Sequence, residues 1–242
     1  MRYLVSGATG FIGGRVVRQL HDAGHEVVAL VRDPGRARQL DDLGVRLVAG
    51  QLADRESLEA AMRGVDGVFH LAGWYHIGAR DKRPAHRTNV EGTRQVLQAM
   101  RDLGIRRGAY ASTLAVNSDT RGRLVDESYR YEGRHLSVYD QTKAEAYRLA
   151  EEFIAPDLPL PPIVPPWVLK LLAAVMTLGE RLLPVPDAFT AEGLRVVAGT
   201  TYIGDNTRAR HELGWEPRSL QEGLRETLAH EMRLLGSQGS SA

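Results

Sequence analysis

A phenol and an ammonium lie one helical turn apart in the sequence. Tyr139 and Lys143 belong to the segment YDQTK, and on a helix side chains four residues apart share a face. A nearby ammonium, together with hydroxyls of a bound cofactor, lowers the free-energy cost of a phenolate, so Tyr139 is a candidate acid/base near neutral pH. Surface Tyr–Lys pairs at this spacing are ordinary, and the pair indicates proton transfer only in company with other features.

Two hydroxyl side chains are candidates for such additional features. Ser112 and Thr113 directly follow an apolar run, residues 108–111. At the carboxyl end of a parallel strand, hydroxyls point into the crevice where ligands bind. Taken alone, the two residues favour a local turn cap instead.

A glycine turn stands at the start of the chain, in the stretch RYLVSGATGFIGG. An apolar run precedes Gly7, Gly10 and Gly13, and a helical pattern begins at Phe11. A strand, a glycine turn and a helix in this order form the phosphate grip of a dinucleotide-binding fold. The start of the helix offers unpaired N–H groups and the positive end of its dipole to the phosphates.

The first half of the chain alternates between strand and helix patterns, which positions these residues. The expected strands are residues 3–5, 27–31, 45–48, 67–71 and 108–111. The expected helices are residues 11–23, one that begins at Pro34, and residues 57–62, 89–103 and 138–154. Buried runs joined by crossover helices predict an α/β fold with a doubly wound (Rossmann) parallel sheet covered on both faces.

The second strand determines which dinucleotide fits. Enzymes that use NAD usually place an acidic side chain at its end, on the 2′-hydroxyl of the ribose. Here Val31 holds that position and Arg32 follows it. A guanidinium matches the geometry of a phosphate, so Arg32 favours the 2′-phosphate of NADP(H). NAD(H) is the alternative, with Arg32 in solvent and Asp33 on the ribose.

Length and composition exclude several classes. The 242 residues suffice for one large α/β domain, and 31 basic against 30 acidic residues indicate no nucleic-acid surface. Without cysteine there is no disulfide, thiolate metal site or cysteine nucleophile, and His76 and His86 lack partners at metal-ligand spacing, so we expect no metal. A strand that starts at once leaves no room for a signal peptide, and the longest apolar run, residues 167–178, is too short to span a bilayer. We expect a cytoplasmic protein with no membrane association.

Several segments together resemble the extended short-chain dehydrogenases/reductases, in the branch of NAD-dependent epimerases/dehydratases and dihydroflavonol-reductase-like proteins. The segments are SGATGFIGG, VRDP, GVDGVFHLAG, TNVEGTRQVL, YASTLAV, YDQTK and the closing YIGDNTRARHELGWEPRSLQEGL. The resemblance implies that Thr113 takes the place of the catalytic Ser/Thr and that Tyr139 is the acid/base. It implies that Lys143 binds the nicotinamide ribose and tunes Tyr139, while Asn89 braces the active site.

The resemblance also implies a set of cofactor-binding residues. They are Gly7, Thr9, Gly10, Phe11, Ile12, Gly13, Arg32, Gln51, Leu52, Leu71, Ala72, Gly73, Tyr139 and Lys143. The implied activity is hydride transfer to or from a carbonyl or hydroxyl carbon of a small molecule, such as a sugar nucleotide or a ketone, by an NADP(H)-dependent oxidoreductase or epimerase. The alternative is a non-catalytic NADP(H)-binding sensor or interaction protein. For Trp74 and Tyr75, after the fourth strand, we expect packing, with the mouth of a substrate site as the alternative.

The sequence departs from the family pattern at two places. Gln51–Leu52 replaces the usual Asp–Leu pair after the third strand, and Gln51 can still hydrogen-bond an adenine edge. Residues 155–166 carry six prolines where the family continues into a sixth strand and a long substrate-binding excursion. Because proline removes ladder donors and fixes φ, we expect an extended connector with at most a strand remnant at Leu158–Leu160. Either the chain is internally shortened or several tens of residues are missing from this sequence.

The expected organisation has three parts. Residues 1–155 form the dinucleotide-binding domain, residues 156–235 a reduced, mainly helical substrate region, and residues 236–242 a disordered tail. A helix over residues 167–183 presents apolar positions that we expect to cover the core, with a homodimer face as the alternative.

Overall fold

The computed structural model describes residues 1–76, 78–154, 203–219, 221–223 and 225. These residues form two compact units. The larger unit holds the described residues of 1–123 and 129–203, and the smaller holds residues 124–128 and the described residues after Ile203. The predicted connector, the remnant at Leu158–Leu160, the helix over 167–183 and the tail lie outside the described residues.

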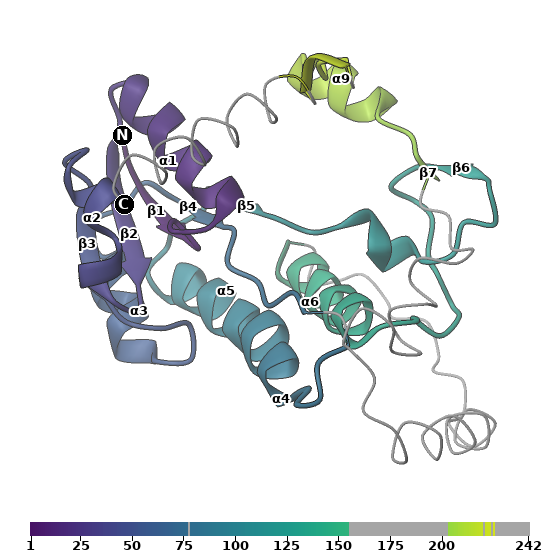
Figure 1. Cartoon of the computed structure of the whole chain (residues 1–242), viewed down its shortest axis with the longest axis horizontal. Helices are drawn as coiled ribbons and strands as arrows, with labels where there is room; N and C mark the ends of the chain where they lie inside the picture. The colour runs from purple at the N-terminus through teal and green to yellow at the C-terminus, as the bar shows by residue number, and fades with distance from the viewer. Residues whose placement is uncertain (77, 155–202, 220, 224, 226–242) are drawn as a thin grey trace, which may run out of the picture. The chain divides into compact units, whose positions relative to one another are not determined.

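A five-stranded parallel sheet in the order β3-β2-β1-β4-β5 forms the centre of the larger unit (Figure 1). The strands are β1 (Arg2–Ser6), β2 (Glu26–Val31), β3 (Arg46–Ala49), β4 (Gly67–His70) and β5 (Gly108–Tyr110). In the ladder, Leu4 of β1 lies opposite Val28 of β2 and Val68 of β4. The strand order reverses between β1 and β4, and doubly wound sheets bind ligands at this switch point, outside the carboxyl ends of the strands. The predicted fold class is confirmed.

The helices follow the predicted pattern with two differences. They are α1 (Phe11–Asp22), η1 (Pro34–Arg36), α2 (Arg38–Asp41), α3 (Arg55–Met62), α4 (Arg83–Ala85), η2 (His86–Glu91), α5 (Gly92–Asp102), η3 (Leu114–Asn117) and α6 (Val138–Ile154). The helix expected from Pro34 is a single 3₁₀ turn followed by a short α-helix, because Asp33 caps the turn at once through Gly35 N (2.9 Å). The helix expected from Asn89 starts earlier, and its first part, η2, is a π-helix.

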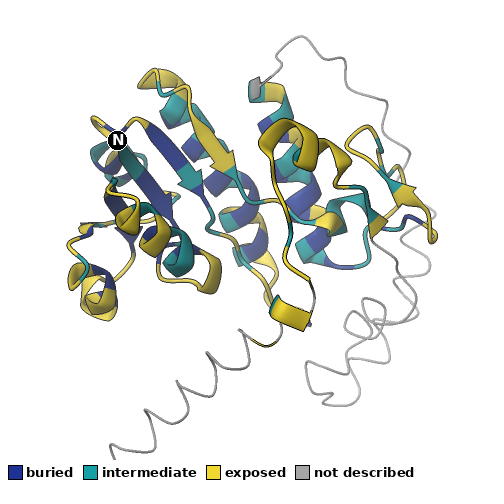
Figure 2. Ribbon diagram, turned by 90° about the horizontal axis from the view of Figure 1, so that it is seen from above, coloured by how far each residue is buried: buried dark blue, intermediate teal, exposed yellow. Residues whose placement is uncertain are grey.

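Strands β1 to β4 contribute to two apolar cores, since successive side chains point to opposite faces of the sheet. The core beneath α3 and α5 contains Leu4, Val28, Leu30, Leu58, Met62, Val68 and Val96. The core beneath α1 and α2 contains Val5, Val17, Val27, Ala29, Val31 and Leu40. Strands β1, β2 and β4 therefore read as continuous apolar runs rather than as alternating ones, and most of their residues are buried (Figure 2), whereas β3 and β5 at the two edges of the sheet have no fully buried residue.

The smaller unit is built from the family's closing segment. β6 (Leu124–Val125) pairs with β7 (Ile203–Gly204), and α9 (Thr207–Leu213) follows. Gly214 ends α9 in the left-handed conformation (φ 60°), a common helix stop. No helix in the described part of the chain has both the length and the apolar character that crossing a membrane requires.

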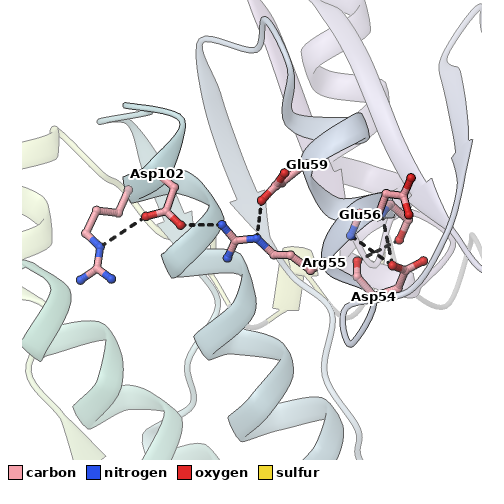
Figure 3. Close-up of polar contacts among 7 residues, drawn as sticks. Asp54, Arg55, Glu56, Glu59 and Asp102 are labelled. Carbon is pink, nitrogen blue, oxygen red and sulfur yellow. Dashed lines mark hydrogen bonds and ion pairs between the residues drawn. The ribbon is translucent and has the colours of Figure 1, made fainter.

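An arginine clamp joins α3 to α5 (Figure 3). Arg55 Nε donates to Glu59 Oε1 one turn along α3 (2.6 Å), and its Nη2 donates to Asp102 Oδ2 at the end of α5 (2.6 Å). Asp54 caps α3, because its Oδ1 accepts from the backbone N–H groups of Glu56 and Ser57. The clamp fixes the helix pair that covers one core.

Arg55→Met should therefore lower the free energy of unfolding by about 1 kcal/mol, the upper range for exposed ion pairs, because two contacts are lost. Urea denaturation measures this. Arg94→Met is the matched control, since Arg94 makes one looser pair with Glu91 within a helical turn (3.5 Å) and should change stability by less than about 0.5 kcal/mol. Equal losses in the two variants would show that the link between the helices adds nothing.

Candidate active site

The glycine turn between β1 and α1 has a backbone that admits no larger residue. Gly7 has φ +74°, and a Cβ on it would stand 2.7 Å from Ala72 N. A Cβ on Gly13 would stand 2.0 Å from Gly7 O, so α1 packs directly against the turn. A Cβ on Gly10 would meet the same oxygen at 3.2 Å.

The start of α1 faces away from the core. Gly10 is its N-cap residue, no side chain caps it within the described residues, and its first turn carries no acidic group. Thr9 is exposed, and Phe11 and Ile12 are 61% and 59% exposed despite their apolar side chains. A bare turn and an uncapped helix start beside a sheet switch point fit the pyrophosphate of a dinucleotide.

The segment after β4 lies against the same turn. Leu71 N donates to Ser6 O (3.2 Å) and Ala72 N donates to Ser6 Oγ (3.3 Å). Leu71 and Ala72 are half-buried and Gly73 is exposed. The structure thus brings these three predicted cofactor residues to the turn that holds Gly7.

At the end of β2, Arg32 is exposed whereas Asp33 is engaged locally. Asp33 Oδ1 accepts from Gly35 N, and Oδ2 lies 3.4 Å from Arg36 Nε. After β3, Gln51 is exposed, and Leu52 packs against the α3/α5 core. Leu52 therefore has a packing role there, and the contact with cofactor stays a prediction.

The predicted catalytic residues meet where β5 leads into η3. Thr113 Oγ1 accepts from Ala115 N (3.3 Å), which makes it a turn cap. Its side chain also lies near enough to the Tyr139 phenol to influence the pKa of that group. Burial raises the pKa of Tyr139, and Thr113 opposes that rise. Tyr139 is therefore a neutral phenol at neutral pH.

Lys143 is buried one turn further along α6. Its Nζ donates to Ala111 O (2.7 Å) and to Tyr110 Oη (2.8 Å), both at the end of β5. Burial lowers the pKa of Lys143 to about 8. The ammonium is thus held at β5. Lys143 is not among the groups that shift the pKa of Tyr139 in this structure.

Asn89, for which the resemblance implied a bracing role, is buried and hydrogen-bonded on both sides. Trp74 N donates to Asn89 Oδ1 (2.7 Å), and Asn89 Nδ2 donates to Trp74 O (3.0 Å) and to Thr142 Oγ1 (3.0 Å). The amide therefore ties the segment after β4 to α6. Tyr75 is not packed in the interior. It is 68% exposed, and its ring lies edge-on to that of Tyr139 with centroids 4.7 Å apart.

The sequence did not single out four polar residues near the site: the buried Ser6, His70 and Thr93, and the half-buried Tyr110. His70 lies in the segment GVDGVFHLAG and Tyr110 opens YASTLAV, so the signal was a polar residue at the end of an apolar strand. Ser6 Oγ lies 2.7 Å from His70 Nδ1, and His70 Nε2 lies 3.0 Å from Thr93 Oγ1. Among the described residues, no group of three or more His, Cys, Asp or Glu side chains could hold a metal ion.

Comparison with known proteins gives consistent matches. The model of the NAD dependent epimerase/dehydratase family matches residues 3–158. A protein of Synechocystis sp. named "Putative dihydroflavonol 4-reductase" is 32% identical over 259 residues, which span 97% of this chain and 72% of the relative. That alignment is longer than the 242-residue chain, so it contains positions at which the relative has a residue and this chain has none.

Two further matches cover less of the proteins concerned. The "4-hydroxy-2-methyl-3-oxo-4-farnesyl-3,4-dihydroquinoline-1-oxide ketoreductase" of Stigmatella aurantiaca is 40% identical over 150 residues, 62% of this chain and 45% of the relative. The structure of a UDP-glucose 4-epimerase from Thermus thermophilus in complex with NAD aligns with a TM-score of 0.56 and 28% identity, over 63% of this chain and 50% of that chain. This chain thus spans half or less of these two proteins. The family model nevertheless covers well over half of this chain, which belongs to the NAD-dependent epimerase/dehydratase family of extended short-chain dehydrogenases/reductases.

Proposed function

We propose that the chain is an oxidoreductase that uses NADP(H) to interconvert a carbonyl and a hydroxyl group on a small molecule, such as a ketone or a sugar nucleotide. The gathering of Thr113, Tyr139 and Lys143 at the end of β5 carries this proposal: Thr113 influences the Tyr139 phenol, and Lys143 one turn away donates to Tyr110 Oη and Ala111 O. These residues lie at the carboxyl edge of the sheet, where the glycine turn also lies. The relatives named as a ketoreductase and an epimerase are consistent with either substrate type.

Each residue has a defined part in the reductive direction. Thr113 and Tyr139 together hold the carbonyl oxygen of the substrate, and Tyr139 donates its proton to that oxygen as the C=O bond becomes C–OH. The bound nicotinamide supplies the hydride that adds to the carbonyl carbon. The resulting phenolate then takes a proton from solvent, and Lys143 holds the ribose. The protein thus contributes orientation and electrostatics.

The choice of NADP(H) over NAD(H) rests on the end of β2. Asp33 is occupied by Gly35 N and Arg36, whereas Arg32 is exposed. A ribose 2′-hydroxyl would need a free carboxylate, and a 2′-phosphate needs a free guanidinium. This preference goes beyond the family match, since the epimerase structure holds NAD.

Arg32→Ala should weaken NADPH binding by about 1.5–3 kcal/mol, the value of one hydrogen bond to a charged group, and leave NADH binding nearly unchanged. Nicotinamide fluorescence titration measures both affinities. Arg46→Ala is the matched control, because Arg46 is an exposed arginine at the opposite, amino end of β3. Equal affinities of the unmodified protein for NADPH and NADH would overturn the preference.

Tyr139→Phe removes only the hydroxyl, so turnover should fall about 10²- to 10⁴-fold while cofactor binding is kept. Steady-state rates with a panel of ketones and sugar nucleotides, alongside NADPH titration, measure the two effects. Tyr3→Phe is the control, since the Tyr3 hydroxyl meets Met1 Sδ away from the site. Full turnover in Tyr139→Phe would remove this residue from the mechanism, and binding without any turnover in the unmodified protein would support the sensor alternative.

Cofactor affinity should fall as the pH rises through about 8. Lys143 is an ammonium below its lowered pKa and a neutral amine above it, so attraction to the anionic cofactor is present at low pH and lost at high pH. NADPH titrations between pH 6.5 and 9.5 would record the loss (a working range of about three units around the midpoint). Lys143→Arg keeps its charge and should abolish this pH dependence, and a decline of equal size in that variant would assign it to another group.

A further inference from the structure

A buried chain of hydrogen bonds leads from the glycine turn to the catalytic lysine. Its members are Ser6 on β1, His70 on β4, Thr93 on α5, Tyr110 on β5 and Lys143 on α6. We propose that Tyr110 is the residue that positions Lys143, and that Thr93, His70 and Ser6 fix the direction of its hydroxyl. This inference rests on the proposed function, which gives Lys143 its place on the cofactor.

The proton positions along the chain follow from one carbonyl. Thr93 Oγ1 lies 2.6 Å from Asn89 O, and a carbonyl only accepts, so the single Thr93 proton is donated there. Thr93 Oγ1 can then only accept, so its 3.0 Å contact with His70 takes the proton from Nε2–H. Thr93 is also a polar neighbour of Tyr110, and we assign the Tyr110 proton to it.

The same reasoning fixes the histidine. Burial and the Lys143 charge lower the pKa of His70 to about 3, so the ring is neutral and carries one proton. That proton is on Nε2, which leaves Nδ1 as an acceptor for the Ser6 hydroxyl at 2.7 Å. Ser6 Oγ in turn accepts from Ala72 N (3.3 Å), beside the glycine turn.

Tyr110 Oη therefore accepts a hydrogen bond from Lys143 and does not donate one to it. Burial raises the pKa of Tyr110 to about 12, which keeps it a neutral phenol. The Lys143 ammonium has three donors, and within the described residues Tyr110 Oη and Ala111 O take two of them. The third donor is left for the nicotinamide ribose.

His70 from β4 and Tyr110 from β5 face Lys143, and Tyr139 and Asp140 share its helix. His70, Tyr110 and Tyr139 are neutral near pH 7. Asp140 is a buried carboxyl residue whose charge acts on Tyr139. The acceptor on Tyr110 is consequently a principal stabiliser of the ammonium, together with the face of the same ring, whose centroid lies 4.3 Å from Nζ.

Tyr110→Phe tests this role, because it keeps the ring and removes the acceptor. The chain has lysine only at positions 82, 143 and 170, so ¹³C-labelled lysine gives few signals, and Lys143→Arg assigns the one that matters. The Lys143 midpoint should lie near pH 8 in the unmodified protein and about one unit lower in Tyr110→Phe, a roughly tenfold loss of proton affinity. Tyr3→Phe should leave it unchanged. No shift in Tyr110→Phe, or an equal shift in Tyr3→Phe, would overturn the inference.

A second pair of variants tests the polar residues next to Tyr110, and it replaces the first test if Tyr110→Phe does not fold. Thr93→Val removes the acceptor of the Tyr110 proton and should lower the Lys143 midpoint, whereas Thr93→Ser keeps a hydroxyl and should restore it. Identical midpoints in the two variants would contradict the assigned proton directions. These titrations need neither substrate nor cofactor, so a protein without turnover would refute the proposed function and leave this test intact.

Discussion

The close approach between the glycine turn and the chain leaving β4 is the constraint on which the whole site depends. Only glycine fits at Gly7 and Gly13, since a Cβ at either would press into backbone at 2.7 Å or 2.0 Å. That approach pulls β1, β4 and α1 together at the point where the strand order reverses. It also sets Ser6 beside His70, from which the buried hydrogen-bond chain reaches α6. Phosphate grip and catalytic helix are therefore two ends of one packed arrangement.

Burial decides the charge pattern of this arrangement. Desolvation disfavours charged forms, so His70 and Tyr110 are neutral and Tyr139 keeps its proton at neutral pH. Lys143 remains cationic below a pKa of about 8, because oxygens of Tyr110 and Ala111 replace part of its lost hydration. Within the described residues, the candidate site thus combines a protonated phenol, Tyr139, with a buried cation, Lys143.

Local patterns in the sequence predicted the sheet and the helices well, because apolar runs, glycine stops and caps act over a few residues. The structure places Thr113 and Tyr139 near the end of β5 and ties Asn89 to α6, while their roles stay predictions. The sequence patterns did not reveal the hydrogen-bond partner of Lys143. The spacing places Lys143 on the same helix face as Tyr139, but its Nζ donates to Tyr110, 33 residues away. The patterns also did not predict that Tyr75 is exposed, with its ring against Tyr139 of α6. Tertiary contacts of this kind leave no periodic trace in the sequence.

The placement of the site residues separates chemistry from substrate choice. The residues proposed to move a proton or hold the cofactor lie just beyond the carboxyl ends of strands, at the start of α1, on η2 or on α6, and none of them belongs to residues 155–202. Asn89 ties the segment after β4 to α6 through Trp74 and Thr142. The groups proposed to act on a substrate are therefore positioned by contacts among the described residues of the larger unit, and these contacts do not themselves select one substrate.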